Sequence, residues 1–164
     1  METREKTYHI LKYAFYESRI HSVFLTGSFI TVFALARILG YAELTEIRFI
    51  NYVIAFFVAY DAIKKVYIRN GHQVEYFTGL SIGIATIVLG QLWYSILFFI
   101  YLKIDPEFTI RLLKQIPQNI IAPAFSTAVL LFLEGFGLSP VISLALMQYF
   151  KSKQGRWARG KRAV

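Results

Sequence analysis

Long apolar blocks separated by short polar segments dominate the chain from about residue 21 to residue 150. A helix needs about 20 mostly apolar residues to cross a bilayer, because each residue adds about 1.5 Å and every backbone group must be hydrogen-bonded internally. Four blocks reach this length, at about residues 22–42, 47–66, 76–102 and 119–150. The pattern predicts an all-α polytopic membrane protein with four transmembrane helices in a bundle.

The fourth block is longer than one span requires and contains a potential helix break at Gly135, Gly137 and Pro140. Proline lacks the N–H that continues a helix, and glycine weakens helices. Two interpretations are open: one kinked helix, or two segments separated by a break of the kind that lines solute paths in transporters. Two full spans here would place the C-terminus on the opposite side of the membrane.

Short helices lying at the membrane surface are predicted on both sides of the bundle. In residues 8–20, apolar Leu11 and Phe15 share one helical face while Lys12 and Arg19 lie off it, which suits an interfacial helix. After the third block, a helix start is predicted, because an aspartate can cap, a proline fits the first position and a glutamate complements the dipole. These residues and the apolar stripe that follows are Asp105, Pro106, Glu107, Phe108, Leu112 and Ile116.

The distribution of positive charge predicts the orientation of the bundle. Only four of the 18 Lys and Arg residues fall in the predicted outer segments: Arg48, Lys103, Arg111 and Lys114. Apart from Arg37, the others lie before the first block, from the end of the second block to the start of the third, and after the fourth. Short cytoplasmic segments are enriched in basic residues, so both termini are predicted to be cytoplasmic. The predicted organisation is an interfacial N-terminal segment (1–20), a transmembrane domain (21–150) and a basic cytoplasmic tail (151–164).

Composition supports this membrane assignment and limits the partners. Hydrophobic residues make up 56% of the chain and charged residues 17%, against about 25% charged residues in soluble domains. The net charge of +8 is divided between apolar blocks instead of forming one continuous face, so no nucleic-acid partner is expected. We expect a multi-pass protein of the inner (cytoplasmic) membrane, with anionic lipid headgroups bound at the basic tail.

Ionisable groups inside spans are costly and are therefore candidates for function. Asp61 precedes Lys64 and Lys65 by three and four residues near the cytoplasmic end of the second span, a spacing that predicts an interfacial ion pair.

A second polar group is predicted deeper in the bundle. Counted from the inner ends of their spans at 1.5 Å per residue, Arg37 and Glu134 both lie at roughly 24 Å and Gln91 at roughly 22 Å. This coincidence predicts a buried Arg37–Glu134 ion pair supported by the Gln91 amide. Two alternatives are open for this polar cluster: Arg37 can extend to the outer interface, or the pair can form a proton or ion site.

The glycines of the third span predict close helix packing. Gly79 and Gly83 form a small-xxx-small step that Gly90 extends, and such steps let helices approach where lipid supplies no hydrophobic drive.

Recognisable catalytic chemistry is missing from the sequence. His9, His21 and His72 fall at or outside the span ends without helical-spacing partners for a metal site, which is typical of ordinary interfacial residues. The chain has no cysteine, phosphate-binding loop, nucleophile elbow or metalloprotease motif. We therefore expect no enzyme activity, no metal and no cofactor.

Four short strings flank the predicted spans. They are Leu11-Lys12-Tyr13, Ala62-Ile63-Lys64-Lys65, Asn70-Gly71-His72-Gln73-Val74-Glu75-Tyr76-Phe77 and Ile100-Tyr101-Leu102-Lys103-Ile104-Asp105-Pro106-Glu107-Phe108. In this arrangement, over about residues 8–150, the chain resembles a family of small Gram-negative membrane proteins, domain-of-unknown-function family 4199. The resemblance implies four helices and an inner-membrane address, and implies no activity, because that family is uncharacterised.

Three functional hypotheses follow from these features. The leading one is a non-enzymatic structural or interaction subunit that packs through the glycine face of the third span against another membrane protein or a second copy. The alternative is a small oligomeric transporter or ion channel that uses the Arg37, Gln91 and Glu134 layer. The third is a lipid-processing membrane enzyme.

Overall fold

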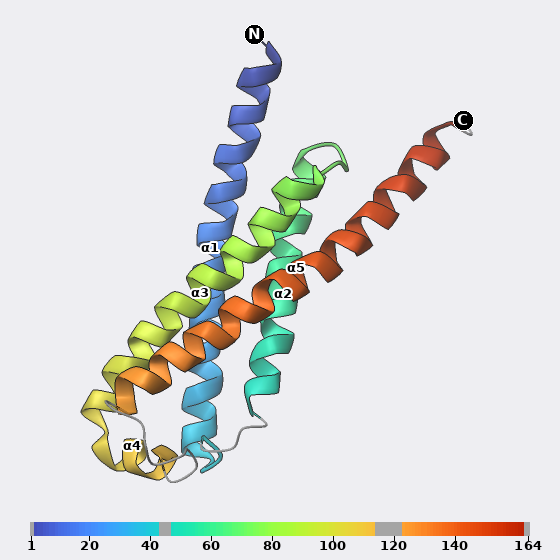
Figure 1. Cartoon of the computed structure of the whole chain (residues 1–164). Helices are drawn as coiled ribbons and strands as arrows, with labels where there is room; N and C mark the ends of the chain where they lie inside the picture. The colour runs from blue at the N-terminus through green and yellow to red at the C-terminus, as the bar shows by residue number, and fades with distance from the viewer. Residues whose placement is uncertain (1, 43–46, 114–122, 163–164) are drawn as a thin grey trace.

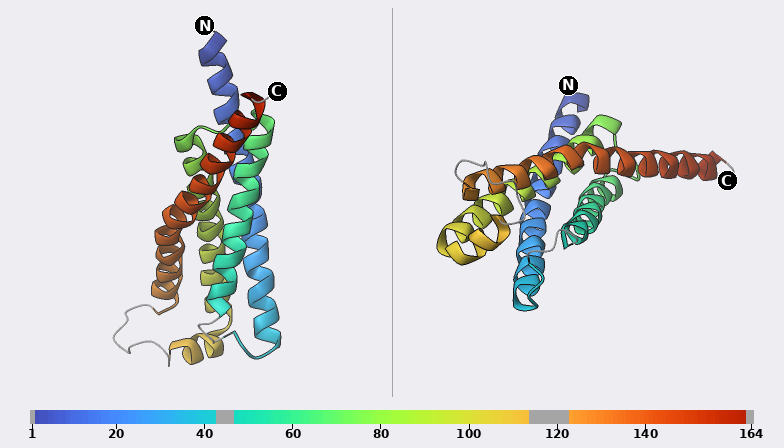
Figure 2. Two further views of the ribbon diagram at one scale, coloured as in Figure 1. Left: turned by 90° about the vertical axis from the view of Figure 1, so that its right-hand side faces the viewer. Right: turned by 60° about the horizontal axis from the view of Figure 1, so that its bottom comes forward.

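Four long helices and one short helix form the part of the chain that the structure, a computed structural model, describes: residues 2–42, 47–113 and 123–162. The helices are α1 (Glu2–Ile38), α2 (Ile47–Arg69), α3 (Tyr76–Ile104), α4 (Pro106–Leu113) and α5 (Pro123–Arg162). The long helices alternate in direction, so that the two termini lie at the same end of the bundle (Figure 1). The short α4 lies across the opposite end (Figure 2). The all-helical prediction is confirmed for these residues.

Three helices contain segments that are long and apolar enough to cross a membrane: Lys12–Ile38, Tyr76–Ile104 and Ala124–Gly155. The second helix, α2, has a comparable length of 23 residues but carries charge towards both of its ends. Arg48 lies near its start, and Asp61, Lys64 and Lys65 lie in its second half, so the uncharged stretch between Arg48 and Asp61 is short. The structure thus supports a helical membrane protein with three candidate spans.

The flanking segments continue the long helices instead of forming separate elements. Residues 8–20 belong to α1, which runs without interruption from Glu2 to Ile38. The stretch is therefore helical as predicted but is not a separate short helix, and its location at the membrane surface stays a prediction. The predicted tail is likewise a continuation of α5 as far as Arg162. Helical propensity persists through these polar stretches because neither contains a proline.

The fourth apolar block forms one helix. Pro140 lies inside α5, and the helix continues on both sides of it, so the alternative of two separate segments is wrong. Proline removes the N–H that would bind the carbonyl of residue 136, four positions earlier. The Ser139 hydroxyl donates to this Phe136 carbonyl at 2.8 Å and replaces the lost donor. The predicted start of this block, Asn119, lies outside the described residues.

Helices α1 and α3 run parallel, and two hydrogen bonds between them share one register. Ser18 donates to the Ile82 carbonyl at 3.4 Å, and Thr26 to the Gly90 carbonyl at 3.0 Å. Both pairs are separated by 64 positions in the sequence. Hydroxyl groups bound to backbone carbonyls of a neighbouring helix are a common tie between membrane helices, where no water competes.

The predicted helix after the third span begins as expected. The Asp105 carboxylate accepts the Phe108 amide at 2.9 Å and caps α4. Phe108 and Leu112 are buried against Leu102 of α3 and Ala124 of α5. The third residue of the predicted stripe, Ile116, lies outside the described residues.

Part of the buried face of α1 is polar, and large apolar side chains lie exposed on α1 and α3. Ser18 and His21 are 1% and 3% exposed, whereas Phe24 on α1 and Phe77 on α3 are 65% and 73% exposed. Soluble proteins rarely expose contiguous apolar surface of this kind, and lipid is the solvent that favours it.

Candidate functional site

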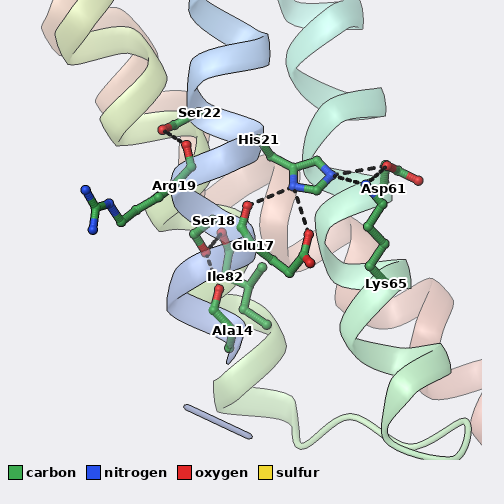
Figure 3. A network of polar contacts seen from close by, with 9 residues as sticks. All are labelled: Ala14, Glu17, Ser18, Arg19, His21, Ser22, Asp61, Lys65 and Ile82. Carbon is green, nitrogen blue, oxygen red and sulfur yellow. Dashed lines mark hydrogen bonds and ion pairs between the residues drawn. The ribbon is translucent and has the colours of Figure 1, made fainter. Parts of the chain in front are cut away.

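A polar cluster joins α1 to α2 through His21 (Figure 3). Nδ1 of His21 lies 2.8 Å from the Glu17 backbone carbonyl and 3.4 Å from the Glu17 carboxylate. Nε2 lies 3.1 Å from Oδ2 of Asp61 and 3.2 Å from Nζ of Lys65. Lys65 and Asp61 are themselves 3.3 Å apart. The imidazole therefore contacts two carboxylates and one ammonium group.

Helical spacing explains why these side chains converge. Glu17 and His21 are four residues apart on α1, and Asp61 and Lys65 are four apart on α2, so each pair shares one helix face. The buried face of α1 also carries Ser18, Ser22 and Thr26. Figure 3 shows Arg19 pointing away from the cluster, on the other side of α1.

His21 corrects the interpretation of the histidines as ordinary interfacial residues. Its side chain is buried, and its partner Glu17 is buried beside it. The signal that could have found it is the Glu17–His21 spacing together with small polar residues at four-residue intervals. This spacing indicates that the polar face of α1 is buried only if the opposite, apolar face of the helix is assumed to contact lipid.

The predicted ion pair at the end of α2 is present in part. Asp61 pairs with Lys65, as its spacing indicates. Lys64 instead places its ammonium group 5.9 Å from the ring centroid of Tyr60. One turn further along, the Arg69 guanidinium lies 3.8 Å from the ring centroid of Tyr13 on α1.

The predicted ion pair of Arg37 with Glu134 is not formed. Nη2 of Arg37 lies 2.9 Å from Oδ2 of Asp105, and Nε donates to the Tyr101 hydroxyl at 3.0 Å. The guanidinium also lies over the Phe108 ring. Arg37 occupies the last turn of α1, so its long side chain extends past the helix end to the α3–α4 junction. The predicted depth of Arg37 is counted along the helix axis at about 1.5 Å per residue, and this count does not include the length of the side chain.

The same network acts on Asp105, which lies just beyond the end of α3. The Phe108 amide, the Tyr101 hydroxyl and the Arg37 guanidinium all favour the charged carboxylate and hold the pKa of Asp105 below its ordinary value, with the amide contributing most. Partial burial acts in the opposite direction and is outweighed.

Glu134 takes a different cation as its partner. Its carboxylate lies 3.4 Å from Nη1 of Arg48 on α2. Gln91 donates from Nε2 to the Leu131 carbonyl of α5 at 2.8 Å. The sequence placed Arg48 in an outer loop, whereas the structure places it in the first turn of α2, where it faces α5. Gln91 and Glu134 thus belong to one layer, and Arg48 replaces Arg37 in it.

A small cavity lies in this layer. Its volume is about 20 Å³, which matches about one water molecule. Arg48, Asn51, Gln91 and Glu134 contribute to its lining, and the buried Oδ1 of Asn51 has no hydrogen-bond partner among the described residues.

The glycines of α3 lie at contacts within the chain. A side chain at Gly79 would collide with Met147 of α5, and one at Gly83 would collide with Ser143 of α5. A Cβ at Gly90 would lie 2.7 Å from Leu25 of α1. This face is therefore occupied by α5 and α1, which corrects the hypothesis that it serves a partner protein or a second copy.

The glycines of α5 have two different environments. A side chain at Gly135 would collide with Gln91, whereas one at Gly137 would meet nothing within 4 Å. Gly135 is required for close packing against α3, and Gly137 faces outward.

Within the described residues, no group of three or more His, Asp or Glu side chains is arranged to hold a metal ion. His21 uses its two nitrogens in opposite directions, towards Glu17 and towards Asp61, so its neighbours do not converge on one point. Comparison with known proteins found no match to a protein-family model, to a curated protein or to a solved structure, so the resemblance to family 4199 stays a prediction.

Proposed function

We propose that this chain is a four-span inner-membrane protein with both termini in the cytoplasm, acting as a non-enzymatic helical subunit of a membrane assembly. The observation that carries the proposal is the pairing of charged groups between different elements of the bundle. Arg37, Arg48 and His21 each hold a carboxylate from another part of the bundle. These contacts fix the helices against one another and leave a largely apolar exterior for lipid and for partner helices.

The fourth span of this proposal is α2. Its 23 residues extend roughly 34 Å, compared with a hydrocarbon core of about 30 Å. It packs in the bundle with α1 and α3, and its charged residues near each end have partners in Glu134 and His21. Four spans also agree with the position of both termini at one end of the bundle, where most basic residues gather (Figure 1).

Reporter fusions test this topology. A fluorescent-protein fusion after Val164 should be bright and an alkaline-phosphatase fusion there inactive, because the C-terminus is cytoplasmic. Alkaline phosphatase inserted after Ala42, between α1 and α2, should be active. An active phosphatase after Val164 would contradict the proposal, since three or five spans would place the termini on opposite sides.

The proposed contact for a partner is a groove between α1 and α3. Its volume is about 310 Å³, and Phe15 and Phe77 are exposed beside it. Small residues line the groove: Ala14, Ser18, Ser81 and Ala85. Small residues allow a further helix to approach closely, which is how membrane helices associate. A transmembrane helix of another protein fits this shape better than a second copy, because a symmetric contact would place one groove against the other.

Cysteine cross-linking in native membranes tests the groove, because the chain contains no cysteine. Ser81→Cys should give a discrete adduct whose second component is a different membrane protein, identified by mass spectrometry. The matched control is Val53→Cys on the exposed face of α2, which should give no adduct. Equal adducts from both positions, or no adduct from Ser81→Cys, would contradict the proposal. An adduct between two copies of this chain would also contradict it, and would show that the groove binds a second copy instead of another protein.

A further inference from the structure

The Nε2 atom of His21 faces two groups with opposite requirements. Asp61 Oδ2, at 3.1 Å, is a carboxylate oxygen and can only accept a hydrogen bond. Lys65 Nζ, at 3.2 Å, is an ammonium nitrogen and can only donate. Nε2 satisfies Asp61 only when it carries a proton, and satisfies Lys65 only when it does not.

The other ring nitrogen has no such conflict. Nδ1 faces the Glu17 carbonyl at 2.8 Å and the Glu17 carboxylate at 3.4 Å, and both are acceptors. Nδ1 therefore carries a proton whether the ring is neutral or charged. The hydrogen bond on one nitrogen determines the state of the other, so the neutral ring has its lone pair on Nε2.

We propose that Nε2 of His21 is a proton-binding site, and that proton uptake there transfers the imidazole from Lys65 to Asp61. In the neutral state, Lys65 donates to Nε2 and holds α1 to α2. In the protonated state, Nε2–H donates to Asp61, and the imidazolium repels the ammonium of Lys65. The hydrogen bond at Nε2 thus changes its partner from Lys65 to Asp61, and both residues belong to α2.

Groups of both signs of charge surround the imidazole, so each ring state has a partner of matching hydrogen-bonding character. Among the described contacts, the charged groups facing His21 are Glu17 from α1 and Asp61 and Lys65 from α2. The α3 contact beside it is the uncharged Ser18–Ile82 hydrogen bond.

The site has a route for protons although the ring is buried. The side chains of Asp61 and Lys65 are 49% and 47% exposed, so they connect Nε2 with the surface. Glu17 covers the other edge and is buried. Protons therefore reach Nε2 from the α2 side.

Nitrogen-15 NMR of the full chain in lipid nanodiscs tests the proposal, with His9→Gln and His72→Gln leaving His21 as the single labelled histidine. The neutral ring should show the Nδ1–H tautomer, and acidification should protonate Nε2 in one step. Lys65→Gln should move the midpoint of this step to higher pH by about one pH unit, because it removes a competing cation. Asp61→Asn should move it to lower pH by about one pH unit, because it removes the charged acceptor.

Lys64→Gln is the matched control, because it removes the same charge from the next residue, which contacts Tyr60 instead of His21. It should move the midpoint much less than Lys65→Gln. A neutral ring in the Nε2–H tautomer, a ring that does not titrate between pH 4 and pH 9, or equal shifts for the two lysine variants would overturn the proposal.

Discussion

The side-chain amide of Gln91 on α3 fills the space beside Gly135 on α5: a Cβ at position 135 would lie 2.6 Å from Cδ of Gln91. The same amide donates to the Leu131 carbonyl one turn earlier on α5. The missing side chain and the hydrogen bond are therefore two parts of one contact.

Gly135→Ala should displace Gln91 and break its bond to Leu131. Loss of this buried bond should lower the free energy of unfolding by about 1 to 3 kcal/mol, measured by thermal or denaturant unfolding in detergent. Gly137→Ala is the control, since its Cβ meets nothing within 4 Å and alanine favours helix. Equal losses for the two variants would show that the contact does not matter.

Gly83 should tolerate a side chain only if Ser143 makes room. Gly83→Ala should destabilise the α3–α5 contact by about 1 to 3 kcal/mol, because it overpacks a buried site. Ser143→Gly in the same chain should recover much of this loss relative to Ser143→Gly alone. Gly27→Ala, on the open side of α1, should have little effect. The absence of recovery in the double variant would contradict this account of the contact.

Double-mutant cycles should separate the observed ion pairs from the one predicted by depth. Arg48→Gln and Glu134→Gln should couple by about 1 kcal/mol, since their charged groups are in contact. Arg37→Gln and Glu134→Gln should be additive, because Arg37 contacts Asp105 and Tyr101 instead. Unfolding midpoints in detergent give each free-energy difference. Coupling between Arg37 and Glu134 would restore the original prediction.

Asp105 should make the stability of the bundle depend on pH in the acid range. Its folded-state pKa is lowered, so its contribution is present at neutral pH and is lost as the pH falls through that lowered pKa. Asp105→Asn keeps a capping side chain but removes the charge, so it should lower the melting temperature at pH 7 and have less effect near pH 3. Glu107→Gln, which removes an exposed carboxylate from the first turn of α4 but keeps the contacts of Asp105, is the comparison and should have a smaller effect. A loss that is the same at both pH values would exclude the charge as its cause.

The sequence by itself determined the helices and the membrane character of this protein. The apolar blocks, the cap at Asp105 and the Asp61–Lys65 pair depend on residues that are close in the sequence. They can therefore be predicted from the order of residues alone. The small-residue spacing of Gly79 and Gly83 also indicated close packing, although not against which helix.

Only the tertiary structure decided which polar groups meet. Arg37 and Glu134 have similar depths on straight axes, but helix crossing, the end of α1 at Ile38 and the reach of a long side chain give them Asp105 and Arg48 as partners. His21 was missed for a related reason: whether a polar face is buried depends on which neighbour covers it. Partner choice is a property of three-dimensional arrangement, because ion pairs and hydrogen bonds require contact within a few ångströms, which position along the chain does not specify.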